Sequence, residues 1–477
     1  CALVISGGTW GRILTRESCS TRRAGRRPAR APTPHICAPR HLRSVYLAAM
    51  SVKQWQRVRD GVIGTFQPLT SPSQQPAPGM IKLTDEHAEV TFAATEDHFD
   101  DQMLPVDCDA VFGETEVGDV LLLSISQRRG SWGDRSTARY RSRCLVLDPS
   151  AEDVDGDTAV AAQLRYYGLP GWSGERILND EPIVEDGKTV GWRAELRWRP
   201  GTEVPLDDGF MLRFSAGHSV AGAYDRRTLT SPFNITVESD ERCSIGEHTT
   251  RLDAVHALLA VAHRETPLAA SGGIKFTASE RGFCDMWERT MMSPNPPGDL
   301  THDFGYLALA NVGGMDGVAA WVRLVLEHRR AVEPVVRHVL FPNQTPESRI
   351  LATAAAMEYW VASNKKRKAE WAKKLPDEKL PGALARFVDP AWSAWIGDSE
   401  QWVESFWSAY LDLKHFRDRP PDPRVVNALE ISGRWLLTAA LLDHCAGSPT
   451  ASRHLFTKGL RYLGGDVREE LWGSPAS

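Results

Sequence analysis

The hydrophobic periodicity of this 477-residue chain changes near residue 250, and this change constrains the fold more than any other feature. From about residue 61 to residue 241, apolar and polar residues alternate in short stretches separated by Gly, Asp and Pro. Such alternation is typical of antiparallel strands with one buried face. After residue 250 the apolar residues recur every three or four positions, which predicts amphipathic helices. We therefore expect a β-rich first half and a helical second half.

The expected elements follow from these two periodicities. Strands are predicted at residues 80–83, 89–93, 106–112, 119–126, 139–147, 159–167, 191–198 and 235–238. Helices are predicted at residues 251–264, 318–340, 348–364, 402–416 and 425–445. The last helix is apolar on nearly all sides, as the central helix of a bundle is. The predicted fold class is α+β, with an N-terminal antiparallel β-sandwich or barrel-like domain and a C-terminal all-α helical bundle.

The length suggests several segments, because one domain usually takes about 150 residues. Residues 1–49 crowd Arg, Pro and Ser ahead of a methionine and lack periodicity, so they are predicted to be a disordered or non-native leader. The remaining segments are predicted as a β-rich sensing domain at 50–245, a mainly helical connecting segment at 246–339, a helical bundle at 340–465 and a tail at 466–477.

The charge distribution limits how the protein can bind nucleic acid. Residues 1–49 hold nine arginines and one acidic residue, so the net charge of −5 leaves the rest of the chain at −13. An acidic body excludes a uniformly basic surface, and any contact with a polyanion must come from a local patch.

The cysteines and the apolar stretches indicate the compartment. The eight cysteines form no CxxC pair and no zinc-type spacing with histidine. No uninterrupted apolar stretch reaches the roughly 18 residues that a membrane span needs. We therefore expect a cytoplasmic protein with no metal site, no cofactor and no membrane contact.

One local basic patch stands at the predicted end of the helix at 348–364. It consists of Lys365, Lys366, Arg367, Lys368, Lys373 and Lys374. Trp371 lies between these cations, so the patch can bind phosphates and stack a base. The alternative is a solvated helix extension without a ligand.

A second basic cluster follows the predicted helix at 402–416 and contains Lys414, His415, Arg417 and Arg419. A histidine can exchange the proton of a ribose 2′-hydroxyl while neighbouring cations hold the phosphate, which is RNA-cleaving chemistry. The alternative is a simple interaction of cations with the negative end of a helix dipole.

Three other polar motifs are interpreted as surface turns. Residues 186–189 resemble the end of a phosphate-binding loop, but Pro182 occupies the position of its first glycine, so a hairpin turn is predicted. The acidic stretch at 152–157 lacks the ligand spacing of a calcium loop. The polar stretch at 97–101 is interpreted as an exposed loop.

The order of several short motifs resembles that of the ApeA-like proteins, bacterial anti-phage abortive-infection factors with a β-rich N-terminal domain and a C-terminal HEPN helical domain. The motifs are Gly61-Val62-Ile63-Gly64, residues 78–83, 111–115, 119–123 and 167–172, the helix Ile350 to Trp360 with Glu358, and residues 432–437. The resemblance covers most of residues 55–465.

The resemblance implies a HEPN domain that dimerises and acts as a metal-independent ribonuclease, with a site made of an Arg, four to six variable residues and a His. His415 matches that His, but the three possible Arg positions hold Tyr410, Ala409 and Ser408. The R-x4-H spacing does occur at Arg251 with His256 and at Arg323 with His328. Both pairs precede the bundle and are interpreted as incidental.

Two hypotheses follow. In the first, the protein is a bacterial defence protein whose β domain senses a phage-derived trigger and whose dimeric bundle binds and cleaves RNA, with His415 as general base or acid and Lys414, Arg417 and Arg419 as cations. In the second, the bundle has lost catalysis and the protein is a non-catalytic sensor that dimerises and binds a protein, RNA or glycan. The missing Arg favours the second.

Overall fold

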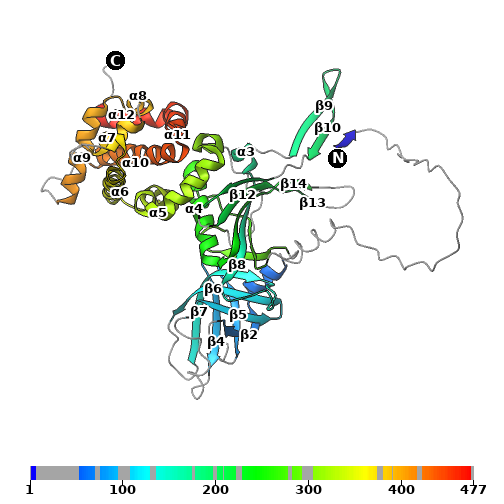
Figure 1. Cartoon of the computed structure of the whole chain (residues 1–477). Coiled ribbons are helices and arrows are strands. Elements are labelled where there is room, and N and C mark those ends of the chain that lie inside the picture. Colours follow the sequence, from blue (N-terminus) through cyan, green and yellow to red (C-terminus); the bar gives the residue numbers. More distant parts are fainter. Residues whose placement is uncertain are drawn as a thin grey trace, which may run out of the picture.

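The computed structural model describes residues 2–6, 53–69, 76–94, 108–128, 136–174, 178–196, 201–207, 209–221, 228–277, 282–292, 305–372, 380–388, 390–415 and 422–473. An antiparallel β region comes first and a helical region follows, and α4 lies between them (Figure 1). The predicted α+β class is confirmed.

Six strands of the β region close on themselves. They are β2 (Val62–Pro68), β3 (Ala77–Leu83), β4 (Ala88–Ala94), β5 (Ala110–Thr115), β6 (Gly118–Arg128) and β7 (Ser136–Leu147). They pair in the order β7-β4-β3-β2-β5-β6, and β6 also pairs with β7, so the pattern is that of a barrel. The alternation that predicts these strands is visible in β3, whose burial alternates along most of its length.

The same sheet continues beyond β7 as an open layer. Its strands are β17 (Cys284–Glu288), β16 (Ser271–Lys275), β8 (Thr158–Tyr166), β15 (Phe233–Ser244), β12 (Phe210–Ala216) and β11 (Thr202–Pro205), in that order. β16 and β17 come from the segment predicted to be mainly helical, and they join the barrel to β8. The sheet is therefore completed by residues far along the chain.

Short elements surround this sheet. They are the strands β1 (Ala2–Ser6), β9 (Leu178–Glu185), β10 (Lys188–Leu196), β13 (Ser219–Ala221) and β14 (Thr228–Thr230) and the helix α3 (Pro170–Ser173). Asp186 and Gly187 link β9 to β10 with φ of 49° and 73°, so the predicted hairpin turn is confirmed. Within the predicted leader, β1 pairs with β10, and residues 7–49 lie outside the described residues.

Helix α4 (Ile245–His263) packs against the sheet on one side and against α5 (Gly314–Leu340) on the other. It begins at a capping box, in which Ser244 and Glu247 satisfy each other's backbone N–H groups. On the sheet side the Tyr166 hydroxyl lies 3.0 Å from His256 Nδ1. On the helical side the Trp321 indole donates to the Ala254 carbonyl at 2.9 Å.

The helical region is built around one apolar helix, α10 (Pro423–Ala446). It is surrounded by α5, α6 (Pro346–Lys366), α7 (Leu380–Val388), α9 (Ser399–Lys414), α11 (Thr450–His454) and α12 (Arg461–Trp472), and α8 (Ala391–Ile396) packs on α12. Single turns lie at Leu309–Val312, Glu370–Ala372 and Leu455–Gly459. α10 is long and apolar enough to cross a membrane, yet most of it is buried by its neighbours, as in the core helix of a bundle.

Close packing of α10 depends on a glycine. A Cβ atom at Gly433 would lie 2.4 Å from the ring of Phe406, which is fully buried on α9. By contrast, a Cβ atom at Gly465 on α12 would meet nothing within 4 Å. Packing of the helical region therefore requires a glycine at position 433 but not at position 465. α12 also extends to Trp472, into the predicted tail.

Candidate functional site

Three polar side chains link the C-terminal end of α9 to the middle of α6. Lys414 Nζ donates to the Tyr410 hydroxyl at 2.9 Å, and this hydroxyl donates to Glu358 Oε1 at 3.3 Å. The pKa of Lys414 is raised by the hydrogen bond with Tyr410 and by the nearby charge of Glu358. Lys414 is exposed, so it presents a stable positive charge at the surface.

His415 follows directly as the C-cap of α9. Its backbone N–H donates to the Leu411 carbonyl at 3.0 Å, and its side chain is exposed. An exposed imidazole at a helix end can meet a ligand without rearrangement of the core. Arg417 and Arg419, the other two predicted residues of this cluster, lie outside the described residues.

Tyr410 is the residue at the predicted Arg position, and the structure explains what it does there. Its side chain is buried, its ring packs 5.1 Å from that of Trp407, and its hydroxyl joins Lys414 to Glu358. A phenol in this place supplies no positive charge. Lys414, one helical turn later, is hydrogen-bonded to the phenol that occupies this position.

The predicted basic patch forms the C-terminal end of α6. Lys366, Arg367 and Lys368 are exposed and Lys365 is half-buried, and their charges complement the negative end of the helix dipole. Arg367 is engaged in an ion pair with Glu327 at 3.0 Å, whereas Lys368 turns the chain with a φ of 58°. The patch therefore exposes cations that face solvent.

The remaining residues of the predicted patch are Lys373, Lys374 and Trp371. Lys373 and Lys374 lie outside the described residues. Trp371 is half-buried, and its ring lies 5.0 Å from the ring of Phe387. Its packing on Phe387 shows that part of the indole surface is used within the protein rather than offered to a base.

The patch and the end of α9 are related through α6. Glu358, which accepts the hydrogen bond from Tyr410, precedes Lys365 by two helical turns on the same face of α6, a rise of about 10 Å. Lys365 thus lies on the face of α6 that meets α9, whereas Arg367 pairs with Glu327 of α5.

The two R-x4-H pairs lie on α4 and on α5, one of the helices that surround α10, and both contain buried histidines. Burial lowers the pKa of His256 to about 4, and its Nδ1 is bonded to Tyr166. His328 sits at a kink in α5, where its φ and ψ of −127° and 38° are non-helical, and its Nδ1 lies 3.1 Å from the Tyr359 hydroxyl. Both imidazoles serve internal packing.

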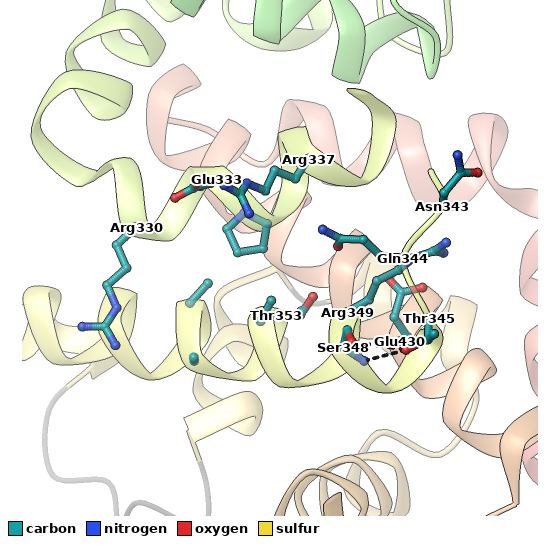
Figure 2. Close-up of a pocket in the computed structure, with 14 residues that line it drawn as sticks. Arg330, Glu333, Arg337, Asn343, Gln344, Thr345, Ser348, Arg349, Thr353 and Glu430 are labelled. Carbon is teal, nitrogen blue, oxygen red and sulfur yellow. Dashed lines mark hydrogen bonds and ion pairs between the residues drawn. The ribbon is translucent and has the colours of Figure 1, made fainter. Parts of the chain in front are cut away.

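The sequence analysis missed a polar pocket between α5 and α6. The pocket has a volume of about 750 Å³, and Glu430 of α10 contributes to its lining. Figure 2 shows Arg330 at one end and Arg349, Gln344 and Glu430 gathered at the other. One sequence signal pointed to it, because Glu430 and Arg434 stand four residues apart inside an otherwise apolar helix.

The deep end of this pocket holds charges that are removed from solvent. Glu430 is fully buried, and its Oε1 accepts from Arg434 Nε at 3.0 Å and lies 4.0 Å from His338 Nδ1. Desolvation, followed by the charges of Arg434, Arg349 and Arg264, lowers the pKa of His338 to about 3. The imidazole is therefore neutral, and the cluster contains more cations than carboxylates.

The chemistry of the described residues sets a limit on metal binding. No group of three or more His, Cys, Asp or Glu side chains in the described part of the chain is arranged to hold a metal ion.

Comparison with known families identifies the N-terminal part. Residues 61–291 match the family model described as ApeA N-terminal domain 1, which covers the barrel and the layer up to β17. The match covers slightly less than half of the chain, so it shows that this region is similar to an ApeA N-terminal domain. The helical region lies beyond the matched residues. Searches of curated proteins and of solved structures gave no match.

Proposed function

We propose that this chain, which carries an ApeA N-terminal domain at residues 61–291, is a cytoplasmic bacterial anti-phage defence protein whose helical region acts on RNA as a HEPN-type domain. The family match is the observation that carries the defence role. In this proposal the β region senses a phage-derived trigger, and the helical region forms a homodimer that binds RNA.

The cations of the helical region support RNA as the ligand. The protein outside residues 1–49 is acidic, so phosphates need a local basic surface. Lys366 and Lys368 at the end of α6 and Lys414 at the end of α9 are exposed cations that can supply one. Because an exposed cation releases counterions when it meets a phosphate, such binding depends strongly on salt.

Cleavage is the proposed activity of this surface. The ribose 2′-hydroxyl attacks the adjacent phosphorus, the bond to the 5′-oxygen breaks, and His415 takes up or supplies the proton. Lys414 stabilises the developing negative charge, and Arg417 and Arg419 are proposed to assist it.

The second hypothesis is that the helical region binds RNA or another partner without cleaving it. The specific observation in its favour is Tyr410, whose buried hydroxyl occupies the place of the motif Arg. A protein that restricts phage without RNA cleavage would follow this second hypothesis.

The test combines restriction with RNA binding. Expression in a bacterial host is expected to lower the plating efficiency of at least one phage in a panel of different phages. If every phage in the panel plated as well as on the control host, the defence role would be contradicted. His415→Ala is expected to abolish metal-independent cleavage while it preserves folding and RNA affinity.

A matched pair of double variants tests the binding surface. Replacing Lys366 and Lys368 by Ala should reduce the slope of log affinity against log salt by about 1.4, because each lost contact with single-stranded phosphate removes about 0.7. The control replaces Lys458 and Arg461, which are equally exposed elsewhere in the helical region. Equal slopes for both double variants would show that the α6 end does not bind RNA.

A further inference from the structure

We propose that the pocket between α5 and α6 binds a free purine nucleotide, with the phosphate at the Arg330 end and the amino-bearing base at Glu430. This site goes beyond the proposed action on RNA, because it is built from different residues and takes a small molecule. Its role would be to report a nucleotide to the helical region.

The first argument is the charge of the walls. Arg330, Arg337 and Arg349 line the pocket, and two of these guanidinium groups already have partners. Arg337 pairs with Glu333 at 2.9 Å, and Arg349 Nη2 donates to the Pro342 carbonyl at 2.5 Å. Arg330 is exposed, has no carboxylate partner among the described residues, and lies 5.7 Å above the Tyr359 ring. It is therefore available to a phosphate.

The second argument is an unsatisfied acceptor at the opposite end. Glu430 is fully buried and lines the pocket, yet its Oε2 has no hydrogen-bond partner in the described part of the chain. A buried carboxylate oxygen in this state costs free energy unless an N–H group reaches it. The exocyclic amine of a purine supplies such a donor, and a carboxylate is a known acceptor for amino groups of bases.

The third argument is the shape of the space between these ends. Ala352, Ala355, Ala356 and Pro334 form an apolar wall without long side chains. The pocket follows α6 from residue 348 to residue 356, a rise of about 12 Å. Its volume of about 750 Å³ lies within the range of small-molecule sites. A flat base and a sugar can lie against this wall with a charged group at each end.

The pocket is separate from the proposed RNA surface. Ala356, the pocket-lining residue of α6 nearest to the patch, precedes Lys365 by nine residues, a rise of about 14 Å. The pocket-lining positions Thr353 and Ala356 face α5, whereas Glu358 points to Tyr410 on α9. A ligand in the pocket thus contacts a different face of the same helix.

The experiment is a calorimetric titration of the full chain with GMP and AMP, with guanosine and inorganic phosphate as fragments. Binding of a nucleotide is expected to be at least tenfold tighter than that of either fragment. Arg330→Ala is expected to weaken nucleotide binding about tenfold or more, because a charge-assisted hydrogen bond contributes about 1.5–3 kcal/mol. The control Arg329→Ala removes an exposed charge next to it in sequence.

A second pair of variants tests the location without disturbing the buried charges. Ala352→Leu adds bulk at an exposed position that lines the pocket and should abolish binding, whereas Ala362→Leu adds the same bulk at an exposed position outside it. Absence of nucleotide binding to the wild type, or full binding to Ala352→Leu, would overturn the proposal. If inorganic phosphate bound as tightly as the nucleotides, the pocket would be a simple anion site and the proposal would be overturned.

An RNA oligonucleotide that displaces GMP competitively would assign the pocket to an RNA terminus and overturn the free nucleotide as its ligand. The titration itself needs neither RNA cleavage nor phage restriction. Its failure would therefore leave the proposed function intact, and failure of the proposed function would leave this result standing.

Discussion

Separate and joint removal of Glu430 and Arg434 should give very unequal losses of stability. The two side chains form a buried ion pair on α10, and Arg264 and Arg349 contribute further positive charge around Arg434. Among the described residues whose charges shift the pKa of His338 or Arg434, Glu430 is the only carboxylate.

The magnitudes follow from which charge is left behind. Glu430→Leu leaves Arg434 buried beside other cations, so the loss should reach the upper part of the roughly 3–5 kcal/mol typical of a broken buried pair. Arg434→Leu leaves Glu430 close to Arg349, which still compensates its charge, and the loss should be smaller, about 1–3 kcal/mol. Replacing both by Leu removes both desolvation penalties, so the double variant should be more stable than either single variant.

The assay is urea unfolding of the full chain, followed by far-UV circular dichroism, with the m-value checked for constancy. Losses of equal size for Glu430→Leu and Arg434→Leu would contradict the excess of positive charge. A double variant whose loss equals the sum of the two single losses would show that the pair is not coupled, and would refute the reasoning.

Three further predictions concern single sites. Tyr410→Arg restores the motif spacing, and the new guanidinium should pair with Glu358, the carboxylate that the phenol now contacts. A gain of metal-independent RNA cleavage would support a nuclease that has lost its motif Arg. A variant that still cleaves no RNA would favour a helical region that only binds. The folded-state pKa of His338 lies below its unfolded value of about 6.5, so its contribution to stability should be lost as the pH falls from about 6.5 toward 3. The loss should be at most about 1.4 kcal/mol per pH unit. His338→Asn should therefore flatten this part of the curve of stability against pH, as measured by urea unfolding. Gly433→Ala should lower the free energy of unfolding by about 1–3 kcal/mol, because the new methyl group meets the Phe406 ring. Gly465→Ala should stabilise α12 by about 0.5–1 kcal/mol, because nothing lies near the new methyl group. Equal shifts of the melting temperature for the two variants would contradict this packing difference.

The periodicity predicted most long elements, because their apolar residues recur at the spacing of a strand or of a helix. The barrel strands β3 to β7 and the helices α4, α5, α6, α9 and α10 overlap the predicted ranges, whereas β2 was not predicted as a strand. Closure of the barrel could not be predicted, because the pairing of β6 with β7 is set by the geometry of the whole sheet. β16 was missed because Gly272 and Gly273 interrupt the apolar pattern; a Cβ at Gly272 would lie 2.8 Å from Met286 of β17.

The candidate site could be predicted only in part, because local sequence shows residue types but not distant partners. His415 and the basic residues from Lys366 to Lys368 were predicted as basic clusters at helix ends, and the structure shows them exposed there. The bond between Tyr410 and Glu358 joins residues 52 positions apart, and no local pattern contains it. The pocket was missed because its arginines are spread over two helices.

Helix α4 connects the β region to the helical region as a buried, packed element rather than as an exposed linker. Its residues are buried along almost the whole length, by the sheet on one side and by α5 on the other. The hydrogen bonds of His256 to Tyr166 and of Trp321 to Ala254 anchor the same helix to both regions. A shift of the β layer would therefore have to move α5, the helix that forms one wall of the pocket. If the chain were cut between the two regions, the half that kept α4 would expose the apolar face that the other half now covers.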